Sequence, residues 1–262
     1  MQQIRLAASD LIEGLRAWVV WGLLGWQDVR QRYRRSLLGP LWLTLSLGVM
    51  VGGLGYVYGD LFKTPIDSYL PFLTGGFVAW GLISTLITES CTVFVAAEGY
   101  IRQLRLPFSL HVFRLIWRNL IIFFHNALVF VVVAIVFKIV PNWGLLWLIP
   151  GLFIILFNAF WVGLVLGALC ARFRDIPQIV SSLIQVVFFM TPIMWKPELL
   201  ANRPVFVHEN PFFHFVELVR APLLGEAIGR DTWVITIGFG LIGSVLAFLF
   251  FARARRRIAY WV

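Results

Sequence analysis

A cluster of arginines gives way within a few residues to a long run of uncharged side chains. The cluster comprises Arg30, Arg32, Arg34 and Arg35. Residues 36–59 then contain no charged side chain, a run of about 24 residues against the ~20 that a helix needs to cross a bilayer. Because arginine enters hydrocarbon only at high cost, the sequence predicts a membrane crossing here, with its cationic end on the inner side.

The composition supports the same interpretation for the whole chain. Hydrophobic residues make up 60% and charged residues 13%, whereas soluble domains have about 45–50% apolar and about 25% charged residues. The net charge of +9 raises the alternative of nucleic-acid binding. However, the arginines bracket apolar runs and form no basic binding module, so we expect no nucleic-acid partner.

Similar uncharged runs recur and predict an all-α integral membrane protein with six transmembrane helices. These are expected at residues 36–59, 68–96, 109–137, 145–170, 176–195 and 232–252. Six crossings put sixteen of the 22 Lys and Arg residues on the inner side and six on the outer side. Since cytoplasmic loops are enriched in basic residues, both termini are predicted to be cytoplasmic.

Two further segments are too short or too charged to span. Residues 1–30 predict an interfacial amphipathic helix, with Leu15 and Trp18 facing lipid and Asp10 on the opposite side. Residues 197–230 predict short helices at the outer boundary.

One of these outer helices has a clear start and two distinct faces. Asn210 is placed to cap it, with Pro211 at its first position. Phe212 begins its apolar face, and Glu217 and Arg220 are expected to turn away from that face.

Small residues follow helical spacing in two of the predicted spans. They are Gly48, Gly52, Gly55 and Gly59 in the first, and Gly163 and Gly167 in the fourth. Such faces let helices approach closely. Helix packing inside one subunit and a seam between two copies both remain open.

The fifth predicted span combines amide and hydroxyl groups with aromatic rings. We expect a substrate channel lined by Tyr56, Tyr58, Gln185, Phe188, Phe189 and Trp195. Sugars present C–H faces for stacking and hydroxyls for hydrogen bonding, so such a wall would suit a sliding glycan. Ordinary aromatic packing is the alternative.

Catalytic and metal-binding patterns are absent from the sequence. There is no G-x-x-x-x-G-K-[ST] phosphate loop, so any ATP must be bound by another polypeptide, and the histidines lack metal-ligand spacing. Glu89 is the one acid inside a predicted span, which leaves an ion-paired residue or a proton relay as its role. His125 in the third span is expected to be a packing residue, although it raises the alternative of a lipid-modifying enzyme.

The predicted inner loop at residues 97–107 is short, basic and amphipathic. Pro107 ends it before the next helix. The pattern alone suits both a lipid-surface segment and an element that docks into a cytosolic partner.

Three stretches together resemble the membrane subunit of polysaccharide-exporting ABC transporters, the family that moves O-antigen, capsule and teichoic-acid chains. They are Arg32-Tyr33-Arg34-Arg35-Ser36-Leu37-Leu38-Gly39-Pro40-Leu41-Trp42, then Phe173-Arg174-Asp175-Ile176 through Phe188-Phe189-Met190-Thr191-Pro192-Ile193, then Asn210-Pro211-Phe212 through Glu217-Leu218-Val219-Arg220. Their order and spacing match over nearly the whole chain. A drug or small-lipid ABC exporter and an ion-coupled secondary transporter are the alternatives.

The resemblance implies a homodimer in the bacterial inner membrane, joined to two copies of a cytosolic ATPase that binds the ATP and Mg. The passenger would be a polysaccharide on undecaprenyl diphosphate. The ATPase-coupling residues would then be Glu98, Tyr100, Ile101, Arg102 and Leu104. The outer gate would contain Phe212, Phe215, Glu217 and Arg220.

Overall fold

The computed structural model describes residues 2–32, 34, 39, 41–200 and 205–262. Most of the predicted arginine-to-apolar junction, at residues 33, 35–38 and 40, lies outside the described residues, as does Arg203. The described residues form helices joined by turns. In chain order these are α1 (Gln2–Arg16), α2 (Trp18–Arg32), α3 (Leu41–Leu61), α4 (Ile66–Ser90), α5 (Glu98–Gln103), α6 (Phe108–Val136), η1 (Trp143–Trp147), α7 (Leu148–Arg172), α8 (Ile176–Met190), η2 (Pro197–Leu200), α9 (Val205–His208), α10 (Pro211–Leu224) and α11 (Arg230–Trp261).

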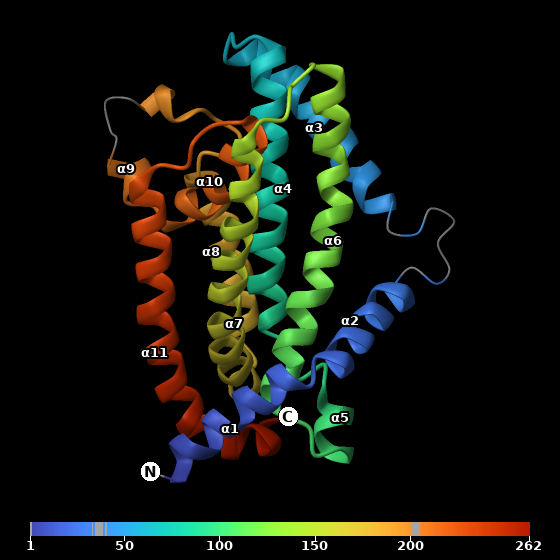
Figure 1. The fold of residues 1–262 in the computed structure, drawn as a ribbon, viewed down its shortest axis with the longest axis vertical. Helices are drawn as coiled ribbons and strands as arrows, with labels where there is room; N and C mark the ends of the chain where they lie inside the picture. The colour runs from blue at the N-terminus through green and yellow to red at the C-terminus, as the bar shows by residue number, and fades with distance from the viewer. Residues whose placement is uncertain (1, 33, 35–38, 40, 201–204) are drawn as a thin grey trace.

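Five long helices build the bundle around α4 (Figure 1). Helices α3, α4, α6, α7 with the preceding η1, and α11 are long and apolar enough to cross a membrane. The apolar part of α4 is 72% buried, against 11% for α3. Helix α4 contacts α3, α6, α7, α8 and α10, so it is the central helix and α3 lies at the edge.

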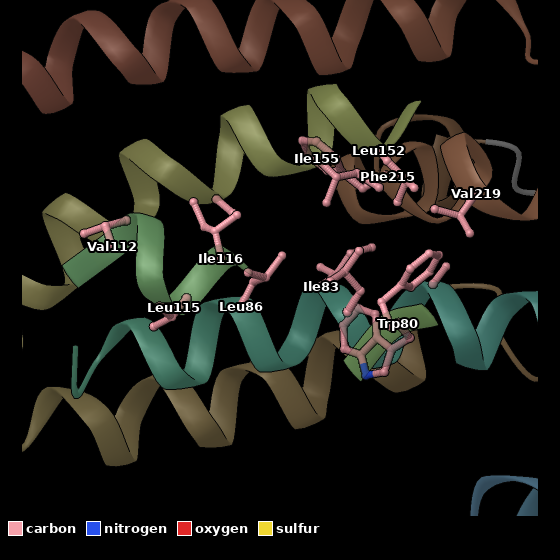
Figure 2. Close-up of a cluster of buried hydrophobic side chains, with 14 of the residues drawn as sticks. Trp80, Ile83, Leu86, Val112, Leu115, Ile116, Leu152, Ile155, Phe215 and Val219 are labelled. Carbon is pink, nitrogen blue, oxygen red and sulfur yellow. The ribbon is translucent and has the colours of Figure 1, made fainter. Parts of the chain in front are cut away.

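The core lies where α4 meets α6, α7 and α10. Figure 2 shows Ile83 and Leu86 of α4 beside Ile116 of α6 and Ile155 of α7. Burial of such a side chain contributes about 1.5–3 kcal/mol in water. Within a bilayer the drive is weaker, because lipid is also apolar, and close packing contributes more.

Both termini lie at the same end of the bundle as α5 (Figure 1). We call this the terminal end, and the end that carries η1, α9 and α10 the distal end. Helix α8 runs from the terminal end toward the distal end, and α11 returns from there. With α8 counted, successive long helices therefore run in opposite directions between the terminal and distal ends.

The fifth predicted crossing, residues 176–195, is a shorter helix than expected. Helix α8 has 15 residues, about 22 Å at 1.5 Å per residue, against ~30 Å of hydrocarbon. It ends at Met190 because Thr191 is extended, with φ −91° and ψ 135°. A residue before proline disfavours the helical conformation, and Pro192 follows Thr191.

Helix α4 also ends early, at Ser90 and not at residue 96. The amides of Cys91, Thr92 and Val93 each bond the carbonyl three residues back, which is the tighter 3-10 pattern of a helix end. The hydroxyl of Ser90 also bonds its own helix, at Leu86 O (2.5 Å). Residues 91–97 then form turns that lead into α5.

The amino-terminal segment is two helices and not one, and Asp10 does not face water. The two helices have different neighbours: α1 packs against both α6 and α11, whereas α2 packs along α6. Asp10 is 1% exposed and accepts hydrogen bonds from the amides of Phe108 (3.2 Å) and Ser109 (3.0 Å). It also pairs with Arg255 at 2.7 Å. The carboxylate thus caps the start of α6, where unpaired amides need acceptors.

The glycines of the small-residue faces pack mainly inside the chain. A Cβ atom at Gly55 would collide with Leu70 of α4, and one at Gly167 would lie 2.5 Å from Val93. Gly52, by contrast, has no neighbour within 4 Å. The close approaches are therefore between helices of one copy, and Gly52 leaves part of α3 uncovered.

Candidate functional site

A groove of about 570 Å³ lies between α3, α4 and α8. Its lining from α3 consists of Leu47 and Met50, and its lining from α4 of Phe77, Trp80, Gly81, Ser84 and Thr88. Helix α8 adds Ser181, Ile184, Gln185, Phe188 and Phe189. We refer to these residues as the groove.

Helical spacing explains why these side chains share one wall. On α4, Phe77, Gly81, Ser84 and Thr88 recur at intervals of four, three and four residues. Residues at these intervals lie on one face of a helix. On α8, positions 181, 185 and 188 repeat the pattern. The short length of α8 and its lack of buried residues leave this wall open on one side.

Aromatic rings gather in the distal part of the groove, and polar groups lie in the part nearer the terminal end. The Phe188 ring centroid lies 5.7 Å from those of both Phe77 and Trp80, and 5.2 Å from that of Phe189. Ser181 and Gln185 make no side-chain hydrogen bond with any described residue. The wall therefore offers ring faces for stacking beside polar groups that are free to bond a passing ligand.

The structure brings together only part of the predicted channel set. Gln185, Phe188 and Phe189 line the groove. Tyr56 is 70% exposed on another face of α3, and Tyr58 packs on Phe62, with ring centroids 5.6 Å apart. Neither tyrosine lines the groove.

Trp195 also lies outside the groove, because α8 ends before it. Its indole N–H donates to Phe189 O at 3.3 Å. Four further groove residues, Phe77, Trp80, Ser84 and Thr88, are not in the predicted channel set. Their signal is the three- and four-residue spacing within α4. The apolar residues on every side of Phe77 and Trp80 obscure it.

The predicted outer-gate residues belong to α10, which lies in the bundle at the distal end (Figure 1). Asn210 caps it as expected, accepting from the amide of Phe212 at 3.0 Å, with Pro211 at the first position. Phe215 is buried, with 7% of its surface exposed. The ring centroids of Phe212 and of Trp80 in the groove are 6.0 Å apart. Helix α10 thus contacts the distal part of the groove wall.

The expectation that Arg220 turns away from the packed face is wrong. Its side chain is 2% exposed and forms an ion pair with Glu217. Its Nη1 donates to Pro192 O at 2.6 Å, and its Cζ lies 4.0 Å from the Phe72 ring centroid. The guanidinium holds the turn after α8 against α4 and α10. It contacts the carbonyl of Pro192 in that turn, the carboxylate of Glu217 in α10 and the ring of Phe72 in α4.

Arg220→Lys tests this contact. Lysine keeps the charge but cannot donate in several fixed directions, so we expect a loss of ~2 kcal/mol of stability. The midpoint of thermal unfolding of the purified protein should fall by about 5 °C. Arg230→Lys, at an exposed position at the start of α11, should shift it by no more than about 1 °C. Equal shifts in the two variants would contradict the assignment.

The predicted coupling residues divide between an inner and an outer face of α5. Leu104 is 52% exposed, and Arg102 is exposed and pairs with Glu98 at 2.8 Å. Tyr100 and Ile101 are half-buried against the bundle. Only part of the predicted set can therefore meet a partner without a change in α5.

Glu89 is ion-paired. Its carboxylate accepts from Arg118 (2.7 Å) and Asn119 (2.7 Å), and Arg32 lies at 3.3 Å. His125 binds only a backbone carbonyl of its own helix through its side chain, with Nδ1 2.8 Å from Ile121 O. Among the described residues, neither side chain has the partners that a proton relay or a serine–histidine pair would need.

The comparisons with known proteins agree with this architecture. Residues 20–224 match the family described as ABC-2 type transporter. The chain is 23% identical over 236 residues to an O-antigen export system permease protein RfbA of Klebsiella pneumoniae, covering 89% of this chain and 91% of the relative. A protein of the same name from Myxococcus xanthus is 24% identical over 173 residues, covering 64% and 65%.

The family match includes all residues of the groove, α5 and α10. The comparisons confirm the family predicted from the three sequence motifs. A member of this family is the membrane subunit of a transporter and crosses the bilayer several times. The chain therefore belongs to the ABC-2 type transporter family and is similar to permeases of O-antigen export.

Proposed function

We propose that the chain is the permease of an ABC exporter that moves a polysaccharide linked to undecaprenyl diphosphate across the bacterial inner membrane. The groove is the observation that carries this proposal. Its exposed ring, Phe189, and the half-buried Phe188 can stack on sugars, and Ser181 and Gln185 can bond hydroxyls. Many shallow contacts of this kind let a long polymer slide, whereas a deep apolar pocket would retain a small molecule.

In this proposal the chain crosses the membrane six times, with α8 and the residues after it as the fifth crossing. The terminal end then lies in the cytoplasm. The distribution of basic residues supports this orientation. Both termini and the basic carboxyl-terminal part of α11 share that end, and basic residues favour the cytoplasmic side.

Two copies are needed to enclose a path. The groove is open on one side, and α3 and α8, which form two of its walls, are the least buried of the bundle helices. Two grooves facing each other would form a corridor lined by both copies. The uncovered Gly52 of α3 supports a close approach there.

Energy comes from a separate cytosolic ATPase, present in two copies and binding the ATP and Mg. Helix α5 is the element that docks into it. Its last turn carries Arg102, and Leu104 and Arg105 follow directly after it, so an exposed apolar side chain lies between two cations in the sequence. An apolar anchor within a charged rim is the usual composition of a protein interface.

Phe188→Ala tests the role of the groove. If each sugar passes the ring in turn, the delay per sugar accumulates with chain length. We expect export of long glycans to slow by about tenfold, equivalent to ~1.4 kcal/mol, and export of short ones to slow much less. The measurement is export of length-fractionated lipid-linked glycan by vesicles that contain the chain and its ATPase.

Phe153→Ala is the matched control, since Phe153 is 70% exposed on α7 and does not line the groove. It should leave both rates unchanged. Equal slowing of long and short glycans by Phe188→Ala would argue against a sliding polymer. Export of a small apolar compound without export of any glycan would favour a drug or lipid exporter.

A further inference from the structure

An ion-pair cluster joins three helices near the terminal end. Arg114 of α6 donates two hydrogen bonds to Asp28 of α2, 2.7 Å to Oδ2 and 2.5 Å to Oδ1. Arg118 of α6 bridges two acids, 2.7 Å from Glu89 of α4 and 3.3 Å from Asp28. These four side chains are between 13% and 24% exposed. We call them the arginine cluster.

One side of the arginine cluster contacts α5. The Cζ atom of Arg114 lies 5.1 Å from the centroid of the Tyr100 ring, a cation–π distance. Tyr100 is half-buried, whereas Leu104 is exposed. Tyr100 therefore connects α5 to the inside of the bundle and leaves the outer face of α5 available.

The other side of the arginine cluster reaches the groove through α4. Glu89 directly follows Thr88, and both Thr88 and Ser84 line the groove. These residues are within two turns of one hydrogen-bonded helix. A displacement of Glu89 therefore moves the groove wall with it.

A cavity of about 50 Å³ lies against the arginine cluster, lined by Glu89, His111, Arg114 and Arg118 among others. His111 is 2% exposed, and neither of its ring nitrogens has a hydrogen-bond partner among the described residues. The Nε of Arg118 has none there either. A buried water needs ~10–15 Å³ and two to four polar partners, so about three waters would fit.

This space distinguishes the arginine cluster from a rigid, fully packed contact. Closely packed interiors resist movement of their side chains. Here the arginines have room to move and unused hydrogen-bonding groups to meet, and Arg118 already lies between two acids.

We propose that the arginine cluster couples movement of α5 to the groove, with Arg118 as the positioning residue and Tyr100 as its contact to α5. This inference rests on the proposed function, in which an ATPase moves α5. A partly buried charge cannot leave its partner without a large penalty. When Tyr100 moves, Arg114 and its partner Asp28 therefore move with it. Arg118, which pairs with both Asp28 and Glu89, then displaces Glu89 and with it α4.

The test compares Arg118→Gln with Arg32→Gln in vesicles that hold the chain and its ATPase. Arg32 also pairs with Glu89, but at 3.3 Å and with 51% of its side chain exposed. The substrate is the undecaprenyl-diphosphate-linked glycan isolated from the source cells. We expect Arg118→Gln to keep ATPase association and hydrolysis within about twofold, while glycan exported per ATP hydrolysed falls at least about tenfold. Arg32→Gln should change that ratio by less than about twofold.

A second pair of variants keeps the proposal testable if Arg118→Gln does not assemble. Tyr100→Phe retains a ring under Arg114, and Tyr100→Leu removes it. Tyr100→Leu should lower glycan exported per ATP, and Tyr100→Phe should not. This contrast separates coupling from a loss of fold, because both variants replace one half-buried side chain by another apolar one.

The outcomes separate this inference from the proposed function. Normal export per ATP in both Arg118→Gln and Tyr100→Leu would overturn the coupling role and leave the exporter intact. A parallel fall of hydrolysis and export would also overturn it, since that is loss of assembly and not of coupling. Failure of the unmodified chain and its ATPase to export the glycan would overturn both.

Discussion

Leu104→Glu is expected to abolish association with the ATPase subunit. Leu104 is an exposed apolar side chain at the end of α5, and Arg102 and Arg105 flank it. The substitution removes the apolar anchor and forces a carboxylate to be desolvated where the partner makes an apolar contact, which typically costs several kcal/mol. Co-purification of the two subunits from membranes measures the effect, and we expect the ATPase to be lost from the complex.

Leu61→Glu is the matched control for this substitution. Leu61 is 66% exposed, but it ends α3 toward the distal end of the bundle. The Leu61→Glu variant should associate with the ATPase subunit as the unmodified chain does. Full association of the ATPase with Leu104→Glu would rule out α5 as the docking element, and its equal loss with Leu61→Glu would indicate a general folding defect.

Gly81→Trp is expected to reduce glycan export to the background of vesicles that lack the chain. Gly81 lines the groove between Trp80 and Ser84, and no atom lies within 4 Å of the position that a Cβ would take. A Cβ atom at position 81 therefore meets no other part of the chain, and the indole attached to it would occupy the groove. It would obstruct the path while the helices keep their packing.

Gly238→Trp introduces the same side chain on α11, again where nothing lies within 4 Å and away from the groove. Export should continue at close to the unmodified rate. The measurement is glycan export into vesicles at equal protein content and equal ATP hydrolysis. Undiminished export by Gly81→Trp would show that the glycan passes elsewhere.

The long helices could be predicted from the sequence because the length of an uncharged run is enough to indicate a membrane-spanning helix. A charge-free run of about 20 residues has few alternatives to a membrane-spanning helix. The cap at Asn210 and Pro211 was also readable, since it depends on adjacent residues. The end of α8 at Met190 follows from Pro192, a local signal that the hydropathy of residues 176–195 outweighed in the sequence analysis.

The positions of Asp10 and Arg220 could not be predicted in the same way. Helical periodicity put both on polar faces, but their partners are distant in sequence. Asp10 meets Arg255 and the start of α6, and Arg220 meets Pro192 O and the ring of Phe72. Only the packing of the bundle brings these groups together, and a charged side chain with such partners can be buried.

The groove shows the same division between local and long-range information. Gln185 and Phe188 stood out because α8 carries amide and hydroxyl side chains at helical spacing, followed by its two aromatic residues. Trp80 and Phe77 lie in the stretch of α4 at residues 75–83, which is apolar on every side, so no contrast marked the face that turns toward α8. Contact between α4 and α8 distinguishes that face.

Photo-crosslinking from position 188 tests the central claim most directly. A photoreactive phenylalanine analogue is placed at 188, or at 153 for comparison, and the vesicles are illuminated while the ATPase turns over in the presence of lipid-linked glycan. We predict glycan-bearing adducts at position 188 that require ATP, and none at position 153. Active export with no adduct at 188, or with equal adducts at both positions, would contradict the account.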